Sequence, residues 1–554
     1  MVCLFVCITY RNGNAQSGFH LPDEFERNAI DKLETQNEKL FQFHTGILPF
    51  KKRTLALEIW NTLNNPEAPI ENHNKNLLYQ YPDVFLSDPA IDSLLKIDTK
   101  PLWKYFYRDG RHFYSHYDDH FSFTVDQVLQ LGLGKENDSK DPLYLNQRGL
   151  LFNANIDQKF SARFFILETQ LSALNYVNEY EQLYAAFPGA GLYKPYKGKI
   201  IKLKKGFDYL LSEGELSYDA SKHVNISLGH GKHFIGHGSR SLFLSDFSTP
   251  YFYLKLQTNL WRFHYQNIYA ELSSETLQDR GNRLLRKKYM AAHVLSANIT
   301  KRWSFGLFES VVFGRENQFE FQYLNPVILY RFVEQSLGSP DNAFLGLQSK
   351  YLINKSMQLY GQIVFDELLV KEFVKLSGWW GNKYGMQLGI KYFDVLKVKD
   401  LDMFLEWNLV RPYTYTFRDS IANYSHFHQA LAHPLGANFS EAILNITYKV
   451  SDKMQLKFSS LYFQKGLDAD TLNFGGNILK DYDSRISDTD NFLFQGEKQK
   501  VLHLKLEGTY QILPQSWFDI GIYMRNENLN AYKRTFVWFH LGFRMTISRQ
   551  TFDF

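Results

Sequence analysis

From residue 119 to the last residue, apolar and polar side chains alternate with a period of two, and no other feature limits the possible folds as strongly. In the segment 121–133, Phe121, Phe123 and Leu131 share one face, whereas Ser122 and Asp126 share the other. The pattern recurs around residues 150–156, 224–228, 386–392, 401–409 and 502–506. Because successive side chains of a β-strand point to opposite faces, the sequence predicts many strands that each have one apolar face.

Such strands could build a soluble sandwich or a membrane-spanning barrel, and three features favour the barrel. The segments are long, at roughly ten residues each, and turn-forming residues separate them. Their polar faces carry charges such as Asp126, Glu406 and Lys505, as in a wet lumen. Aromatic residues, 16% of the chain, gather near segment ends, as at Trp303 and Trp538, where a bilayer has its interfaces. We therefore predict an all-β fold, a transmembrane antiparallel β-barrel of about 16–18 strands.

The end of the chain carries a more specific pattern. In residues 537–547, His540 and Gly542 would face the lumen, whereas Met545 and Ile547 would face lipid. This spacing, with the aromatic Phe554 at the end, resembles the terminal-strand signal that the outer-membrane insertion machinery reads. We therefore expect a Gram-negative outer-membrane protein at the cell surface, in contact with outer-membrane lipid and with that machinery.

The first residues predict a secretory leader. Residues 1–16 begin with an apolar run and continue with small and polar residues around Ala15, which is the order of a signal peptide. No positively charged residue precedes the run, so we expect the true start to lie upstream. A buried N-terminal strand is the alternative interpretation.

Residues 17–118 are too polar to cross a bilayer and predict a partly helical periplasmic or plug segment, with the barrel at 119–554. In residues 23–40, Phe25, Ile30 and Leu33 fall roughly on one face of a helix. A second short helix is predicted at residues 91–95, after the proline-containing start signal at residues 87–89.

Composition excludes several other functions. The net charge is only +4, from 62 basic and 58 acidic residues, which is too balanced to indicate a nucleic-acid partner. Both cysteines, Cys3 and Cys7, lie in the predicted leader, so the mature chain offers no thiolate metal site, disulfide or cysteine nucleophile. Past the N-terminus, no apolar run approaches the length of about 18 residues that a membrane helix needs. We expect no cofactor.

Candidate chemistry is concentrated in the glycine-rich middle of the chain. His230, His233 and His237 could indicate a metal site, but no carboxylate lies among them, so we predict none. Ser239, His237 and Asp246 could be drawn as a hydrolytic triad, but triads are defined by geometry and not by proximity in sequence. We therefore predict that the protein is not an enzyme.

We interpret this middle stretch as a glycine-bent strand or inward loop that lines the barrel. Lys232 and Arg240, with the neighbouring histidines, would then form a cationic, hydrogen-bonding surface suited to an anionic glycan.

Residues 228–272, which begin LGHGKHFIGHGSRSLFLSDFSTP, resemble the centre of the Wzi-type capsule-assembly outer-membrane proteins. They are most similar to the Bacteroidetes branch that includes the gliding-motility protein RemB. HTGILPF at 44–50 and FQYLNPV at 321–327 support the resemblance. It implies a barrel of roughly eighteen strands, an N-terminal helical portion and no known catalysis. The implied role is that of a lectin for exported polysaccharide that anchors or organises capsule, or, in the gliding branch, of a mobile surface component needed for motility.

Glycan binding also needs flat aromatic rings beside hydrogen-bonding groups, and the predicted loops supply them. Trp379, Trp380, Tyr413 and Tyr415 are the candidates. The alternative for the tryptophan pair is that it anchors a strand at the membrane interface. The acidic stretch 479–491 could hold Ca²⁺, but its spacing matches no known calcium loop and favours a solvated loop.

Two functions follow from these observations. The first is a barrel that binds surface or capsular polysaccharide, serves capsule or exopolysaccharide assembly or attachment, and in the gliding branch works with gliding or secretion components. The alternative is a porin-like or substrate-specific transport channel, which a polar lumen equally permits. The polar N-terminal segment and the glycine-rich centre favour an occluded barrel and therefore the first function.

Overall fold

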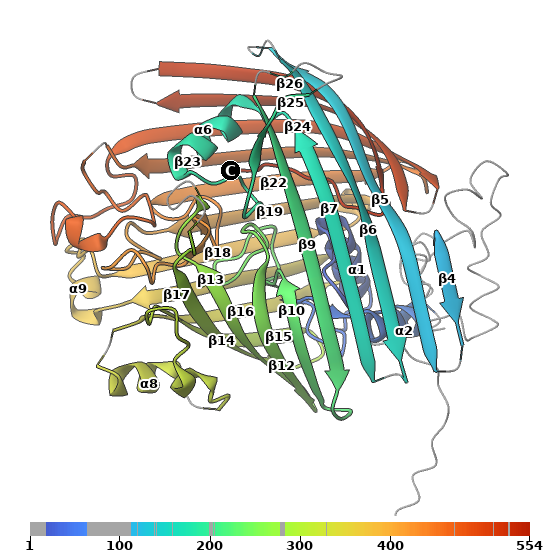
Figure 1. Cartoon of the computed structure of the whole chain (residues 1–554), viewed down its shortest axis with the longest axis horizontal. Helices are drawn as coiled ribbons and strands as arrows, with labels where there is room; N and C mark the ends of the chain where they lie inside the picture. Colours follow the sequence, from blue (N-terminus) through green and yellow to red (C-terminus); the bar gives the residue numbers. More distant parts are fainter. Residues whose placement is uncertain are drawn as a thin grey trace, which may run out of the picture.

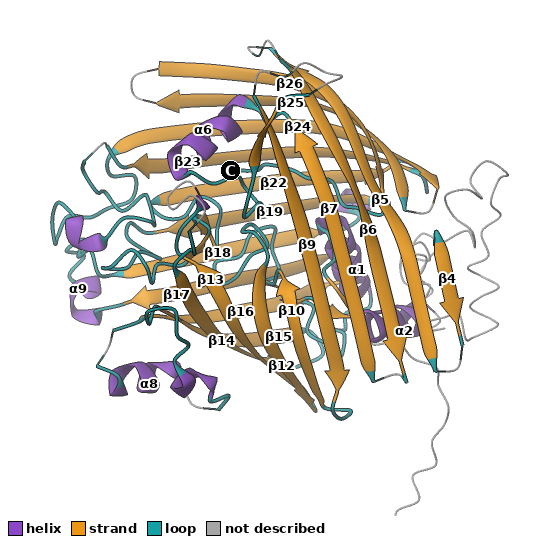
Figure 2. Cartoon of the chain, viewed as in Figure 1, coloured by secondary structure: helices purple, strands orange, loops and turns teal. Residues whose placement is uncertain are grey.

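The computed structural model describes residues 18–63 and 112–554, apart from residues 119, 138, 140, 158, 199–202, 204, 278–282, 328, 339, 470, 514 and 530–531. Eighteen long antiparallel strands form a closed barrel, which is completed where β26 pairs with β5 (Figures 1 and 2). The predicted fold class and strand number are confirmed. The predicted leader and the helix at residues 91–95 lie outside the described residues.

The barrel strands run in chain order around the wall. They are β5 (Phe121–Glu136), β6 (Pro142–Ile156), β7 (Phe160–Leu171), β9 (Gly206–Asp219), β10 (Val224–Gly231), β12 (Tyr251–Leu260), β13 (Phe263–Ser273), β14 (Lys287–Asn298), β15 (Trp303–Phe313), β16 (Asn342–Asn354), β17 (Met357–Glu367), β18 (Lys383–Tyr392), β19 (Leu401–Val410), β22 (Phe439–Lys449), β23 (Met454–Leu467), β24 (Glu497–Leu513), β25 (Ser516–Leu529) and β26 (Tyr532–Met545). The short β4 (Tyr114–Tyr117) and β8 (Lys194–Tyr196) pair with β5 and β9.

The alternation has the predicted meaning. On β5, Leu131 and Leu133 point outward and are 44% and 54% exposed, whereas Asp126 and Gln130 point inward and are almost completely buried. A closed barrel with an apolar outer wall leaves no unpaired strand edge in hydrocarbon, which is what an outer-membrane protein requires. The chain is therefore an outer-membrane barrel. Among the described residues, no helix is long and apolar enough to cross a membrane.

The two ends of the barrel differ. Turns of a few residues join the strands at one end, which we call the turn end, whereas long connections such as 172–205, 232–250, 314–341, 411–438 and 468–496 lie at the other, the loop end. In bacterial barrels the short turns are periplasmic and the long loops extracellular. The loop end therefore faces the cell exterior.

A helical plug lies inside the barrel (Figure 1). Helix α1 (Glu24–Gln36) starts with a capping box in which the Asp23 carboxylate accepts the Glu26 N–H at 2.8 Å and Glu26 accepts the Asp23 N–H at 3.0 Å. The predicted helix is thus confirmed, and Ile30 and Leu33 are buried, but Phe25 is 47% exposed and does not share their environment. Helix α2 (Lys52–Leu63) follows, after the short strands β1 (Phe19–His20), β2 (Ile47–Leu48) and β3 (Phe50–Lys51).

Charged side chains attach α1 to the inner wall. Lys350 on β16 binds Asp31 at 3.0 Å and also Glu34, and Lys391 on β18 binds Asp31 at 2.6 Å. Lys32 reaches the turn end, where Asp394 and Asp402 lie 2.9 and 3.0 Å from its ammonium group. The inward charges that suggested a wet lumen therefore serve in part to hold the plug.

The chain does not end on its last strand. Strand β26 stops at Met545, Thr546 adopts a positive φ of 60°, and the remaining residues turn back into the lumen. Met545 is buried and Ile547 packs on the inward-facing Val128, so the expectation that both face lipid is wrong. Phe554 is buried among aromatic rings of the interior. We call residues 546–554 the tail.

Candidate functional site

The loop 232–250 folds into the lumen, as the glycine-rich sequence predicted. Its strand β11 (Phe234–Ile235) pairs with β2 of the plug, and Phe234 is buried in the apolar core of the plug. The Arg27 guanidinium of α1 lies 4.3 Å from the centre of the Phe234 ring. Loop and plug therefore form one interlocked unit inside the barrel.

The structure separates the three histidines that the sequence placed together. His230 points out of the wall, where its Nδ1 lies 2.9 Å from the Ser212 carbonyl. His233 is fully buried against Tyr251, and His237 lies against Gly46 of the plug, where a side chain at position 46 would clash with its ring. Burial lowers the pKa of both His233 and His237 well below the ordinary value. His233 is therefore not available to a glycan, whereas a glycan contact of the half-buried His237 stays a prediction.

The other chemistry considered for this stretch is not assembled either. Ser239 donates its hydroxyl to Glu24 at 3.2 Å, so its partner is not His237. Among the described residues, no group of three or more histidines, cysteines and carboxylates is arranged to hold a metal ion.

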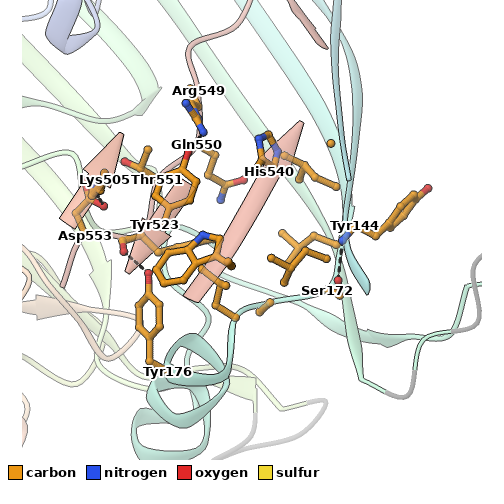
Figure 3. Close-up of a pocket in the computed structure, with 18 of the residues that line it drawn as sticks. Tyr144, Ser172, Tyr176, Lys505, Tyr523, His540, Arg549, Gln550, Thr551 and Asp553 are labelled. Atoms are coloured by element: carbon orange, nitrogen blue, oxygen red, sulfur yellow. Dashed lines mark hydrogen bonds and ion pairs between the residues drawn. The ribbon is translucent and has the colours of Figure 1, made fainter. Parts of the chain in front are cut away.

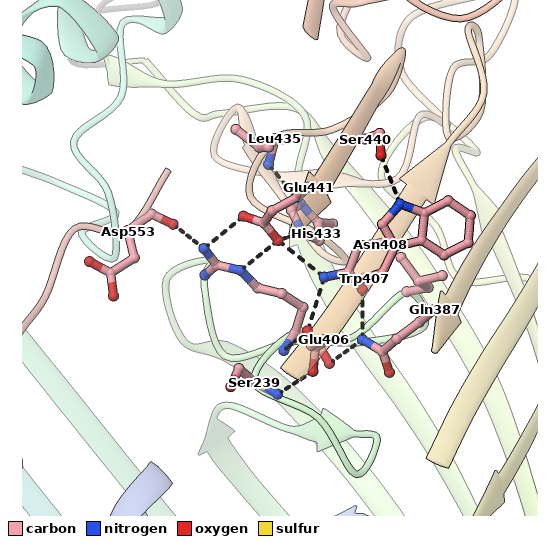
Figure 4. A network of polar contacts seen from close by, with 12 residues as sticks. Ser239, Gln387, Glu406, Trp407, Asn408, His433, Leu435, Ser440, Glu441 and Asp553 are labelled. Atoms are coloured by element: carbon pink, nitrogen blue, oxygen red, sulfur yellow. Dashed lines mark hydrogen bonds and ion pairs between the residues drawn. The ribbon is translucent and has the colours of Figure 1, made fainter. Parts of the chain in front are cut away.

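Ser239, Glu406, Glu441 and Asp553 belong to one polar network (Figure 4), and Arg240 joins its members. The Arg240 guanidinium donates to both Glu441 oxygens, at 3.3 and 3.1 Å, and to the Asp553 carbonyl of the tail. The backbone N–H groups of Ser239 and Arg240 donate to Glu406 at 2.8 and 3.1 Å. The Arg240 charge holds the inward loop and the tail to the wall, and its contact with a glycan stays a prediction.

Lys232 and Arg240 both line a cavity of 1380 Å³ in the lumen. The Lys232 ammonium group donates to the Asp246 carbonyl at 3.1 Å, and burial lowers its pKa. The cavity extends from Lys232 and Pro188 to turn-end residues such as Asp452, and the plug, the tail and the inner faces of β22–β24 enclose it. Its lining mixes cations and anions.

A second cavity, of 110 Å³, is drawn in Figure 3, and residues 549–553 of the tail line both cavities. In the second cavity the rings of Tyr523 and Trp538 stack at 5.1 Å. Tyr176 donates to the Phe552 carbonyl at 2.6 Å and so fixes the tail. Neither ring nitrogen of His503 has a hydrogen-bond partner within the part of the chain that the structure describes. The space suits a few waters.

Loop 411–438 closes the loop end of the lumen, and it uses two predicted ligand residues to do so. Tyr413 and Tyr415 are each 1% exposed. Their hydroxyls donate to the carbonyls of Asn473 at 2.8 Å and Leu242 at 2.7 Å. The prediction that these two tyrosines contact a glycan is wrong, because they join loop 411–438 to two other loops.

The tryptophan pair lies on a half-buried surface of the loop end. Trp380 packs on Tyr482 with 4.7 Å between ring centroids, and the Arg485 guanidinium lies 4.1 Å from the centre of the Trp380 ring. Lys383 lies 5.0 Å from the Tyr482 ring. Trp379 is in contact with Trp380, at 5.8 Å. The pair therefore belongs to a contact between loops 368–382 and 468–496 and not to the lipid-facing belt.

We call Trp379, Trp380, Tyr482, Arg485 and Lys383 the loop-end cluster. The carboxylates of the acidic stretch serve this cluster, since Asp483 and Asp488 bind Arg485 at 3.0 and 2.6 Å. Lys383 lies three residues after Trp380, and the sequence already placed this cation beside the tryptophan pair. Sequence reasoning missed Tyr482 and Arg485, because no local pattern links them to Trp380. Trp380 lies about a hundred residues before Tyr482 and Arg485, and the contact between loops 368–382 and 468–496 brings them together.

Comparisons with known proteins place this geometry among outer-membrane barrels. No protein-family model and no curated protein matches the sequence. The structure is similar to that of Wzi, an outer-membrane protein involved in group 1 capsule assembly in Escherichia coli that is described as a carbohydrate-binding β-barrel. The two chains are 12% identical, the match covers 96% of this chain and 100% of that chain, and the TM-score is 0.57. Pseudomonas aeruginosa OprD is 11% identical over 76% of this chain and 94% of its own, with a TM-score of 0.43. The chain is thus an outer-membrane β-barrel with a Wzi-like fold.

Proposed function

We propose that the protein binds polysaccharide at the cell surface through the loop-end cluster. The observation that carries the proposal is the half-buried stack of Trp380 on Tyr482, flanked by Arg485. An aromatic face offers an apolar platform for a sugar ring, and a guanidinium suits sugar carboxylates or phosphates. The carbohydrate binding described for Wzi agrees with this proposal.

The filled lumen supports a binding role over transport. One apolar cluster joins the wall to the inward loops and the tail, and includes Leu242, Tyr415, Leu431 and Phe554. The 1380 Å³ cavity is the observation that favours the alternative, a substrate-specific channel. Planar-bilayer recordings separate the two functions: the binding proposal expects no large steady single-channel current, and such currents would refute it.

The binding test compares two tryptophan variants in the purified barrel. Trp380→Ala removes the platform, and loss of a central aromatic anchor typically costs about 2 kcal/mol, or roughly a 30-fold rise in Kd for the native capsular or exopolysaccharide. Trp261→Ala is the matched control, because Trp261 is 90% exposed but lies in a turn at the opposite end. Equal binding by both variants would overturn the assignment of the site.

We further propose that this binding holds capsule or exopolysaccharide at the surface and, if the chain belongs to the RemB-like branch, contributes to gliding. The role is one of binding without catalysis. Deletion in the native organism, scored for capsule retention and surface spreading, distinguishes the two roles. Unchanged capsule and unchanged spreading would contradict both.

A further inference from the structure

Part of the outer wall is covered by the protein itself. On β13 and β15, Tyr269 and Val311 point outward but are only 5% and 0% exposed. Leu345, which points outward on the adjacent β16, is 49% exposed, as expected for a lipid-facing residue. Another part of the chain therefore covers the outer faces of β13–β15 but leaves that of β16 exposed.

The cover is the connection between β15 and β16. We call residues 317–327 and 329–337 the strap; it contains the 3₁₀ turn η3 (Phe321–Leu324) and helix α8 (Tyr330–Ser336), which stands outside the barrel wall in Figure 1. The two ends of the connection are tied together, because Arg315 binds both Asp341 oxygens at 2.7 Å. Tyr323 donates its hydroxyl to the same carboxylate at 2.7 Å.

Three outward tyrosines fasten the strap to the wall through its backbone. Tyr289 donates to the Asn317 carbonyl at 2.7 Å, Tyr269 donates to the Leu324 carbonyl at 3.0 Å, and Tyr265 donates to the Pro326 carbonyl. Tyr265 lies near the turn end of β13, so the strap extends along most of the strand length. Irregular backbone is tolerated at membrane depth only where its polar groups are satisfied, and these hydroxyls satisfy three of them.

Under the strap lies a polar row that lipid could not accommodate. Asn267, His293 and Glu309 are register partners on β13, β14 and β15, all point outward, and all are at most 5% exposed. The Tyr330 ring lies 3.8 Å from the His293 ring, and the Arg331 N–H donates to Glu309 at 3.0 Å. Polar side chains on the lipid face of a barrel are destabilising. The strap removes this row from the lipid.

The other side of the strap carries large apolar side chains that are strongly exposed, namely Phe321 (77%), Leu324 (36%), Val327 (84%), Leu329 (54%) and Phe332 (61%). Polar side chains of the strap are exposed between them, at positions 317, 318, 322, 325, 331, 335 and 336. This surface lies beside the lipid-facing belt of the barrel. Tyr265, whose hydroxyl binds the Pro326 carbonyl, is the register partner of Leu295, and Leu295 is the register partner of Leu307, which is 44% exposed. The charge of Arg331 is neutralised by Glu334 at 2.9 Å.

We propose that the strap is embedded in the outer membrane, with its apolar side in contact with lipid acyl chains and its inner side sealing the polar row. The occupant of the exposed face is lipid because that face adjoins the belt at the same depth. Loop 314–341 is then not a surface loop available to glycan, which distinguishes it from the loops of the loop-end cluster.

Site-directed spin labelling in lipid vesicles tests the proposal with the full-length barrel. Single cysteines are placed by Val327→Cys and Phe332→Cys in a chain whose Cys3 and Cys7 are changed to serine. Leu345→Cys reports a belt position, and Leu396→Cys, in a turn and 80% exposed, matches the exposure of Val327 in water. All four positions are on the surface, so folding is not at risk.

The readout is collision with dissolved oxygen, which concentrates in lipid, and with a water-soluble nickel complex. We expect labels at 327 and 332 to follow the label at 345, with oxygen access exceeding nickel access. Nickel access like that at 396 would place the strap in water and overturn the proposal. Low access to both reagents would indicate that protein covers the strap, which also overturns it.

Discussion

Replacing Asp31 by asparagine should loosen helix α1 in the lumen. Asp31 is 5% exposed and bridges Lys350 and Lys391, whose side chains are 1% and 4% exposed. Burial alone would raise the pKa of Asp31, but the two lysines hold that pKa well below its ordinary value. The carboxylate is therefore charged at neutral pH and compensates two buried cations.

The expected loss of docking free energy depends on the lysine that Asp31→Asn leaves without a carboxylate. Removing one partner of a buried ion pair typically costs about 3–5 kcal/mol, because the remaining charge has no compensation. Lys350 keeps the Glu34 carboxylate, whereas Lys391 keeps the uncharged Asn28 amide oxygen at 3.0 Å and the Tyr360 and Phe404 rings at 5.6 and 5.4 Å. We therefore expect the lower limit, about 3 kcal/mol, which corresponds to roughly a hundredfold change in the docking equilibrium of α1.

Hydrogen exchange measured by mass spectrometry gives this number directly. Exchange protection of the α1 amides should fall roughly a hundredfold in Asp31→Asn, while peptides from the barrel strands stay unchanged as an internal reference. Glu38→Gln is the matched control, since Glu38 pairs with Arg302 at 2.9 Å in a solvent-accessible position and should cost at most about 1 kcal/mol. Similar protection losses in the two variants would refute the argument that buried charges dock the plug.

Two further predictions concern the same lumen. Burial lowers the pKa of His44 to about 4 from an ordinary 6.5, so the undocked plug takes up a proton that the docked plug excludes. Docking should therefore weaken by up to roughly 3 kcal/mol as the pH falls from 6.5 to 4. His44→Gln should reduce this pH dependence of α1 hydrogen exchange, and an unchanged pH dependence would show that His44 is not its source. A side chain at Gly238 would clash with Glu406, so Gly238→Ala should reduce the yield of heat-resistant folded barrel on gels. Gly214→Ala is the control, because a methyl group has room at position 214. Equal yields of the two variants would show that the inward loop tolerates displacement.

The barrel could be predicted from the sequence because its signal is local. In each strand, the alternation over about ten residues separates the two faces. The strap that covers the outer faces of β13–β15 has no such local signal. The loops carry no such signal. Arg240 pairs with Glu441 at a separation of 201 residues, and the Tyr415 hydroxyl donates to Leu242 at a separation of 173 residues. A cation or an aromatic residue in a loop looks the same in sequence whether it faces solvent or folds inward.

The tail is an example in which a local sequence pattern predicts the wrong structure. The alternation of β26 continues through Ile547, so the sequence predicts a strand that extends past Met545. Neither Thr546 nor its neighbours are glycine or proline, and the turn is visible only in the positive φ of Thr546. Pairing partners decide the outcome, since β5 pairs with β26 only as far as Met545. Whether the His540–Gly542–Met545 pattern acts as an insertion signal stays a prediction.

The inward charges bear on function as well as on folding. A channel would leave its lumenal charges to water and solute, but here Lys350 and Lys391 bind the plug, Glu406 and Glu441 bind the inward loop, and Lys505 binds Asp553 of the tail. Substitutions inside the lumen should therefore impair folding or docking first. Substitutions in the loop-end cluster should impair binding while the barrel folds normally. A binding barrel separates these two phenotypes, whereas in a channel the lumenal residues would carry both.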